Sequence, residues 1–317
     1  MDFLKKAVHR SFIMSLVAIG LLTCPHLCSA GIELVNTRLD PKDNVAEYLS
    51  CIAEKGVTLI SAHRGGPKPG FPENALESLK AAVNHGPMLL EVDVRETADG
   101  QLILLHDASL ERTTTGKGNL SDYSLKELQE LRLVDNDQRE TAFAIPTLLE
   151  VLRWADDRAI VQLDVKRGVS YEQVARTVVA ADAVDSVVII TYRLEDILTS
   201  FNVDNRLSFS YSIDDKSDLQ ALEDAETPRS QLVAWTGVVD EIEKPVWPVL
   251  EALDIPFAAG AFWDLEEKII KTNNTQPYIA LSEAGTDVVG SDYYWLAYDT
   301  LDKQQDMANA LSACNDK

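Results

Sequence analysis

Basic side chains are few in this 317-residue sequence: 29 Lys and Arg stand against 51 Asp and Glu, a formal net charge of −22. So acidic a protein repels nucleic-acid phosphates at long range, and no stretch of the chain supplies the dense basic patch that would overcome the repulsion. Nucleic acid is therefore excluded as a partner. Hydrophobic residues make up 46% of the chain, enough for a large core, which excludes a disordered protein.

Cysteine is scarce as well. Two of the four cysteines lie in the first thirty residues, and only Cys51 and Cys314 lie beyond them. A pair so far apart excludes a disulfide-dense miniprotein and fits an oxidising compartment better than a metal or redox motif.

No apolar run reaches the roughly 20 residues of a membrane-spanning helix. The longest, residues 11–23, follows three basic residues and precedes a small-residue end at Ala30, a pattern typical of a secretory signal peptide. We expect cleavage of residues 1–30 and export of residues 31–317, without an integral membrane segment, to a periplasm or the medium. A short membrane anchor or a lipoprotein signal at Cys24 is the alternative.

No linker or short repeat divides the remaining chain, so we expect one domain over residues 31–317. Eight apolar runs rich in β-branched residues alternate with segments of helical spacing. This alternation indicates a parallel sheet, and eight units in this length fit a closed (β/α)8 TIM barrel of the α/β class. An open doubly wound sheet is the alternative. The predicted strands are residues 57–63, 88–97, 159–165, 187–191, 207–211, 232–235, 256–262 and 286–290. The predicted helices are residues 72–85, 147–155, 171–181, 194–201, 241–253 and 265–271.

A further strand-like run, residues 102–106, follows the turn Asp99-Gly100. Such a pair favours a two-residue β-hairpin, because its backbone needs positive φ angles. In a simple hairpin of this kind Asp93 lies opposite His106. We therefore expect a β-hairpin after the second strand, followed by an insertion over residues 107–146.

Two of the predicted strands carry charged residues at alternate positions. Glu91, Asp93 and Arg95 share one face of the second strand, and Asp164 and Lys166 share one face of the next parallel strand. Carboxylates facing the inside of a barrel are costly unless compensated, and a divalent cation that prefers oxygen ligands is the usual compensation. Structural ion pairs, Arg95 with Glu91 and Lys166 with Asp164, are the alternative.

Two histidines are expected at the same end of the barrel. His63 ends the first strand and His106 ends the hairpin. An imidazole has a pKa near ~6.5, so a pair can serve as base and acid at neutral pH. Arg64 and Lys166 add positive charge suited to a phosphate.

Aromatic residues gather at the predicted carboxyl ends of the later strands. Such residues commonly serve only in packing, but this rim is also where a leaving-group pocket would lie, and aromatic faces attract quaternary ammonium groups. We regard Trp263 and Tyr293 as candidate substrate contacts. The full set is Tyr192, Trp235, Trp263, Tyr293 and Tyr294.

Short motifs follow one another in a specific order, densest between residues 61 and 118. They are His63-Arg64-Gly65, Pro72-Glu73-Asn74, Glu91-Val92-Asp93-Val94, Asp99-Gly100, His106-Asp107 and Arg112-Thr113-Thr114, with Ile145-Pro146-Thr147-Leu148 and Gly290-Ser291-Asp292-Tyr293 further on. In this order and spacing they resemble the glycerophosphodiester phosphodiesterase family. The resemblance is weak beyond residue 190.

The resemblance implies a (β/α)8 barrel that hydrolyses a glycerophosphodiester to glycerol 3-phosphate and an alcohol. It implies one divalent cation, Ca²⁺ or Mg²⁺, held by Glu91, Asp93 and Asp164. The family usually has Glu at the third position, so Asp164 is one methylene shorter. His63 and His106 would be the general base and acid.

The same resemblance assigns the phosphate to Arg64 and Lys166, and gives Glu73 either a substrate contact or a role at a helix start. The alternatives are a lysophospholipase D-like or cyclising phosphodiesterase and a non-catalytic protein that binds phosphodiesters. Barrel closure would also bring the two ends of the domain together, so we predict a Cys51–Cys314 disulfide.

Overall fold

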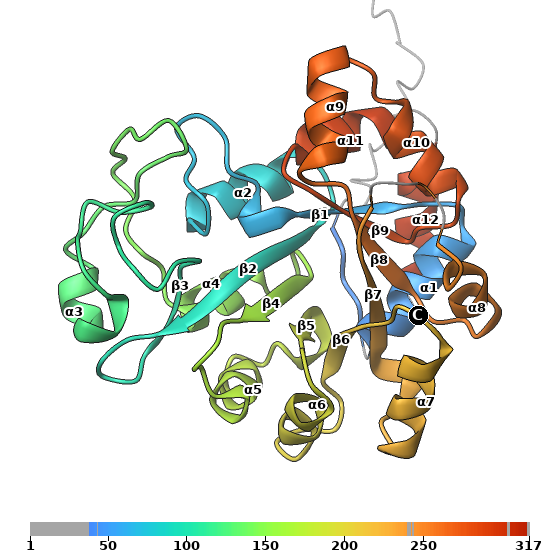
Figure 1. Cartoon of the computed structure of the whole chain (residues 1–317), viewed down its shortest axis with the longest axis horizontal. Coiled ribbons are helices and arrows are strands. Elements are labelled where there is room, and N and C mark those ends of the chain that lie inside the picture. Colours follow the sequence, from blue (N-terminus) through green and yellow to red (C-terminus); the bar gives the residue numbers. More distant parts are fainter. Residues whose placement is uncertain (1–37, 43, 240–241, 243, 303–304, 316–317) are drawn as a thin grey trace, which may run out of the picture. The chain divides into compact units, whose positions relative to one another are not determined.

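The computed structural model describes residues 38–42, 44–239, 242, 244–302 and 305–315, so the predicted signal peptide lies outside the described residues. Eight parallel strands form a closed ring in the order β1-β9-β8-β7-β6-β5-β4-β2, which the pairing of β1 with β2 completes (Figure 1). The expected TIM barrel is confirmed, and the open sheet is wrong. The strands are β1 Leu59–Ala62, β2 Leu89–Glu96, β3 Leu102–Leu104, β4 Val161–Val165, β5 Val187–Ile190, β6 Ser208–Ser212, β7 Leu232–Val238, β8 Phe257–Gly260 and β9 Val288–Ser291.

Helices follow most strands, and all six predicted helical segments contain one. The predicted helix at 241–253 shortens to α8, where a proline occupies the first turn. The sequence reading missed α1, α3, α7, α10, α11 and α12. The helices are α1 Val45–Glu54, α2 Leu76–His85, α3 Leu125–Leu128, α4 Leu148–Ala155, α5 Tyr171–Ala180, α6 Leu194–Phe201, α7 Lys216–Asp224, α8 Trp247–Ala252, α9 Asp264–Thr272, α10 Gln276–Glu283, α11 Tyr294–Leu301 and α12 Met307–Cys314.

The expected hairpin is present, but its register differs by one residue from the prediction. β3 pairs antiparallel with β2 through Val94 opposite Leu104, and the amide of Leu105 donates to the carbonyl of Asp93 (3.0 Å). The connection has three residues rather than two, with Gly100 at a φ of 75°. A three-residue loop that ends in a left-handed glycine shifts the pairing by one position. Asp93 therefore does not lie opposite His106.

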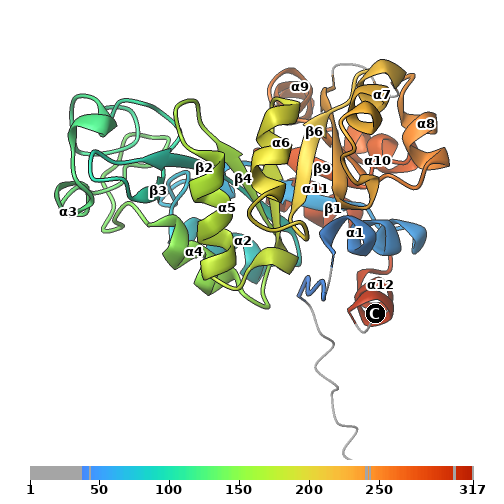
Figure 2. The ribbon, with the colours of Figure 1, turned by 90° about the horizontal axis from the view of Figure 1, so that it is seen from below.

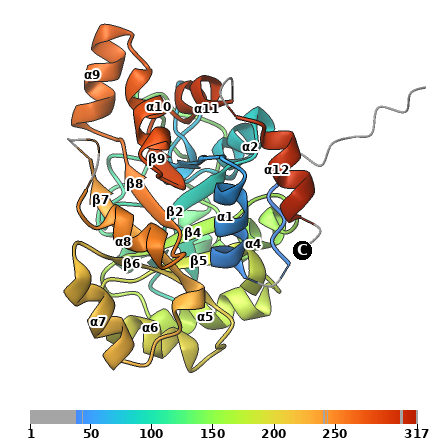
Figure 3. The ribbon, with the colours of Figure 1, turned by 90° about the vertical axis from the view of Figure 1, so that its right-hand side faces the viewer.

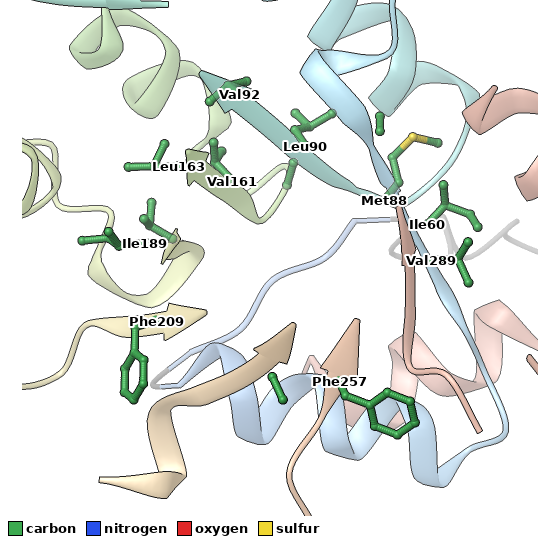
Figure 4. Close-up of a cluster of buried hydrophobic side chains, with 14 of the residues drawn as sticks. Ile60, Met88, Leu90, Val92, Val161, Leu163, Ile189, Phe209, Phe257 and Val289 are labelled. Carbon is green, nitrogen blue, oxygen red and sulfur yellow. The ribbon is translucent and has the colours of Figure 1, made fainter. Parts of the chain in front are cut away.

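The strands bury their two faces in different cores. Outward residues such as Leu90 and Val92 of β2 and Leu163 of β4 pack in the layer between the barrel and its helices (Figure 4). Figure 2 shows α5 and α6 of that outer layer side by side. Inward residues at the amino ends of the strands, including Leu59 and Leu89, pack with α1 and α12 into a second core. The amino end of the barrel is thus closed by apolar side chains.

The predicted disulfide is confirmed. Cys51 of α1 and Cys314 of α12 are bonded, with their Cα atoms 6.0 Å apart, and the two helices lie side by side (Figure 3). The bond links segments 263 positions apart in the sequence.

The insertion after β3 has a small core of its own, built by Ile103, Leu110, Leu120, Leu128 and Leu133. This core holds the loops that carry Asp107 and Arg112 beside the barrel. Over the described part of the chain, every helix is too short or too polar to cross a bilayer.

Candidate active site

A cavity of about 340 Å³ opens at the carboxyl ends of the barrel strands. Its charged wall includes Glu91 of β2, Asp164 of β4, His63 directly after β1 and His106 just after β3. This is the end of a TIM barrel at which active sites form. The structure therefore brings both predicted histidines and two of the predicted carboxylates to one cavity.

The three predicted carboxylates form one cluster. Glu91, Asp93 and Asp164 each offer an oxygen atom, and these atoms lie within 4.8 Å of one another. Burial, the neighbouring Asp93 and the neighbouring Asp164 raise the pKa of Glu91 to about 8. Several like charges in a buried place account for that increase, because each disfavours ionisation of the others.

The cluster fits a divalent cation. Its donors are carboxylate oxygens, which hard cations prefer, and its excess negative charge is what such a cation would neutralise. The observation that carries this conclusion is that the three carboxylates offer oxygen atoms within 4.8 Å of one another. Tyr192 adds a hydroxyl that donates to Asp164 Oδ1 at 2.6 Å, so a third strand end also supports the cluster.

Lys166 lies among these carboxylates. Its ammonium group is 2.6 Å from Asp93 Oδ1 and also pairs with Asp164. Burial would lower the pKa of Lys166, but these two carboxylates raise it. The structural ion pair of Lys166 with Asp164, the alternative of the sequence analysis, is thus present. Arg95 instead donates to the carbonyl of His106 (2.8 Å).

Asp93 is also fixed from the opposite side. The Asn74 side chain donates to Asp93 Oδ2 (2.6 Å) and accepts from the Asp93 amide (2.9 Å). Asn74 and Arg64 have positive φ angles of 57° and 52°, and in this conformation the amide of Arg64 donates to Glu91 Oε2 (2.7 Å). Strained backbone of this kind is common where a site needs fixed donors.

His63 is held on two sides. Its Nδ1 atom lies 2.6 Å from Asp292 Oδ1, and its ring stacks on Phe262 with centroids 4.6 Å apart. Burial would lower the pKa of His63, but the hydrogen bond to Asp292 and the charge of Glu91 raise it overall. A carboxylate at Nδ1 fixes the ring orientation and leaves Nε2 for a ligand.

His106 has the same kind of anchor. Its Nδ1 atom lies 2.7 Å from Asp107 Oδ1, and the Arg112 guanidinium donates to both oxygens of Asp107 (2.6 and 2.8 Å). The hydrogen bond from Arg112 holds the pKa of Asp107 well below its usual range. Asp107 therefore stays ionised beside the imidazole.

Glu73 joins two arginines. Arg112 donates to both its carboxylate oxygens at 2.8 Å, and Arg64 Nη1 donates to Oε2 at 3.1 Å. Burial would raise the pKa of Glu73, yet the two guanidinium groups lower it overall. The Nε atom of Arg64 is buried and has no hydrogen-bond partner among the described residues. The nearest carboxylate oxygen to it is Asp93 Oδ2 at 3.8 Å, so this N–H group is one Arg64 donor for a ligand oxygen.

Glu266, at the start of α9, supports the residue that holds His63. It is only 1% exposed, accepts from Tyr278 Oη (2.7 Å) and the Asp292 amide (2.9 Å), and also bonds the Ser291 hydroxyl. Burial raises the pKa of Glu266. Sequence reasoning missed this residue, because nothing in its local sequence relates it to the end of β9.

The predicted aromatic rim is only partly right. Tyr192, Trp235 and Trp263 line the cavity, whereas Tyr293 lines a neighbouring cleft. Tyr294 is fully buried in the outer core and is not part of the rim. Trp263 is 65% exposed and has a φ of 70°.

Other residues at the site carried a signal that the sequence reading left without a role. Asp107 and Arg112 belong to the motifs noted above, and Asp292 follows β9 directly, at the end of the barrel where site residues gather. Their partners became visible only in three dimensions, since Glu73 and Arg112 are 39 positions apart.

The sequence model of the glycerophosphoryl diester phosphodiesterase family matches residues 63–269 of this chain. A glycerophosphodiester phosphodiesterase of Caldanaerobacter subterraneus is 36% identical over 114 residues, which cover 35% of this chain and 46% of that protein. One of Bacillus altitudinis is 37% identical over 111 residues, covering 35% and 45%. The chain thus spans about half the length of these curated relatives.

Solved structures show the same fold over more of the chain. A glycerophosphoryl diester phosphodiesterase of Parabacteroides distasonis superposes with a TM-score of 0.75 at 28% identity, covering 85% of this chain and 95% of that one. An Oleispira antarctica phosphodiesterase, solved in complex with the product sn-glycerol-3-phosphate, has a TM-score of 0.60 at 22% identity, covering 79% and 99%. The second likeness concerns the fold alone.

Proposed function

The chain belongs to the glycerophosphoryl diester phosphodiesterase family, and from that premise we propose that it hydrolyses glycerophosphodiesters to glycerol 3-phosphate and an alcohol. The observation that best supports this proposal is that two imidazoles, each held at Nδ1 by an aspartate, line the same cavity as the carboxylates. A protein that only bound phosphodiesters would not need such a pair. The sn-glycerol-3-phosphate in the Oleispira antarctica relative is consistent with this product.

In this proposal His63 is the general base. Its hydrogen bond to Asp292 raises its pKa and directs Nε2 to the cavity, so it takes the proton of the attacking hydroxyl. His106 gives a proton to the departing alcohol from its own Nε2 atom, because Asp107 holds its Nδ1. The attacking group is either the neighbouring hydroxyl of the glycerol, which yields a cyclic phosphate, or water.

Glu91, Asp93 and Asp164 would hold one divalent cation, Ca²⁺ or Mg²⁺. When bound, it supplies Lewis-acid stabilisation of phosphate charge and a template for the substrate oxygens. Lys166 and the Nε–H of Arg64 are the protein's own cationic donors for the phosphate. Glu73 orients Arg64 for that contact, rather than touching substrate.

The test is hydrolysis of a panel of glycerophosphodiesters by the purified protein, with chelator and then with Ca²⁺ or Mg²⁺ added back. We expect chelation to abolish activity and metal to restore it. The Asp93→Asn variant should lose metal binding by calorimetry and turnover together while its circular dichroism stays native. Full activity in excess chelator would refute the metal role. Lysophospholipids are assayed beside the panel, and faster cleavage of these than of any glycerophosphodiester would favour the lysophospholipase D alternative.

We also propose that the protein is exported and that residues 1–30 are removed, leaving one domain over residues 31–317. The Cys51–Cys314 disulfide supports this, since such bonds persist in oxidising compartments. Amino-terminal sequencing of the protein recovered from its natural host is the test, and a first residue other than Gly31 would contradict it.

A further inference from the structure

A second cleft, of about 480 Å³, borders the active-site cavity. The two share His63, Arg64 and Trp263 in their linings, but His106 lines only the first. The second cleft adds Lys68 and Tyr293. A group that extends from a substrate into this cleft therefore leaves the reaction centre on the side of His63.

Each acidic group of this cleft has a partner within the described part of the chain. Three carboxylates lie in the lining, and each has a basic side chain within hydrogen-bond distance. The pairs are Glu73 with Arg112 (2.8 Å), Asp137 with Arg139 (2.7 Å) and Asp292 with His63 (2.6 Å). Arg64 also pairs with Glu73 (3.1 Å), so among the described Lys and Arg side chains of the lining Lys68 is the one without a carboxylate partner.

Lys68 differs from the other charged residues of this cleft in its partners. Its ammonium group donates to the Tyr294 hydroxyl (3.1 Å) and lies 5.1 Å from the ring centroid of Phe71, but it makes no ion pair with any carboxylate of the described residues. It is available to an anionic ligand.

The loop that carries Lys68 is held in place by several local contacts. Proline precedes and follows it, and two backbone hydrogen bonds between Lys68 and Phe71 (2.9 and 2.7 Å) close the turn. The amide of Gly70 donates to the buried Asp135 (2.8 Å), which fixes the loop to the insertion. A cation held in advance costs less conformational entropy when a ligand binds.

We propose that this cleft binds a second oxyanion, a phosphate or carboxylate on the glycerol part of the substrate, with Lys68 as its cationic donor. The inference rests on the proposed function in the form in which the glycerol hydroxyl is the attacking group, so that His63 faces this hydroxyl and His106 faces the leaving alcohol. The preferred substrates are then diesters whose glycerol carries a further acidic group on its other primary hydroxyl.

The test compares four substrates that share the 4-nitrophenyl leaving group. They are glycerol 3-(4-nitrophenyl phosphate) with a free 1-hydroxyl, a 1-methyl ether, a 1-carboxymethyl ether or a 1-phosphate. Release of 4-nitrophenolate by the metal-loaded protein gives kcat/KM for each. A charged hydrogen bond should favour the phosphate or carboxylate substrate over the methyl ether about tenfold, mainly through KM.

Variants then identify the donor. Lys68→Met should remove the preference, Lys68→Arg should keep most of it, and Lys126→Met, a change of an exposed lysine on α3, should leave the ratio unchanged. A preference that survives in a folded Lys68→Met protein, or no preference in the wild type, overturns the inference while the proposed function stands. A preference for phosphate but not carboxylate narrows the ligand to phosphate. If none of the four substrates is cleaved, the proposed function fails, and this inference fails with it.

Discussion

The two ends of β2 place different chemistry on one face of the same strand. Leu89, near its amino end, is buried among the apolar residues under α1 and α12, whereas Asp93, four positions later, lies among carboxylates, Asn74 and Lys166. The apolar end needs no partner beyond close packing. At the charged end, hydrogen bonds and ion pairs compensate part of the buried charge, and the excess negative charge remains for a cation. Changes at one end should therefore affect stability, and changes at the other should affect turnover.

The largest loss of turnover without a loss of stability is expected for substitutions of the two active-site histidines. His63→Ala and His106→Ala should each lower kcat by roughly 10² to 10⁴, the range for general acid–base catalysis. Thermal unfolding should change little, since both rings are at the open end of the barrel. His85→Ala is the matched control, because His85 ends α2 and pairs with Asp299 (2.8 Å) outside the cavity. Near wild-type kcat in either active-site variant would contradict the assigned roles.

The opposite result, a loss of stability without a loss of turnover, is expected at the apolar amino end of the barrel. Leu89→Ala removes a fully buried side chain and should lower the free energy of unfolding by about 2 to 5 kcal/mol, while kcat per folded molecule is kept. Urea denaturation monitored by tryptophan fluorescence measures the loss. Leu253→Ala is the control. Its side chain is 39% exposed, so this substitution should lower the free energy of unfolding far less. Loss of kcat in folded Leu89→Ala protein would show that the two ends are coupled.

A smaller effect on the free energy of unfolding is expected at Asp287, which precedes β9 at the amino end of the barrel. Burial raises the pKa of this carboxyl from 3.8 to about 7, although its side chain accepts from the Phe257 amide (2.8 Å). The native state then holds a proton that the unfolded state releases, so the contribution of this carboxyl to stability is complete below about pH 4 and is lost as the pH rises through about 7.

Asp287→Asn keeps an acceptor for that amide and removes the titration. The variant should gain about 1 to 2 kcal/mol relative to wild type between pH 4 and 8. Unfolding free energies measured at pH 4.5, 6 and 8 provide the test, and parallel curves for the two proteins would disprove it.

Much of the active-site arrangement could be predicted from local pattern. The alternation of Glu91 and Asp93 on one strand, together with Asp164 on the next parallel strand, indicated the carboxylate cluster, because strand geometry and barrel topology fix which side chains meet. The hairpin was predicted as well, but its register was not. One extra loop residue, with Gly100 in the left-handed region, shifted the pairing.

Other contacts had no local signal. Glu266 reaches Asp292 across 26 positions, and Glu73 joins Arg112 across 39. Lys68 is one of many lysines in the sequence, and only the structure shows that it lies at a cleft without an acidic partner. Such long-range contacts depend on how the insertion and α9 pack, which the periodicity of each segment alone does not specify.

The sequence by itself determined the barrel, the pairing of its two late cysteines, and the residue types at its open end. These follow from periods of two and 3.6 residues and from the short menu of folds that bury alternating strands and helices. Only the tertiary structure decided which acidic side chain pairs with which basic side chain. Ion pairs and hydrogen bonds are set by distances of a few ångströms between segments far apart in the chain, and small changes of loop length or helix packing alter those distances without changing the pattern that defines the fold.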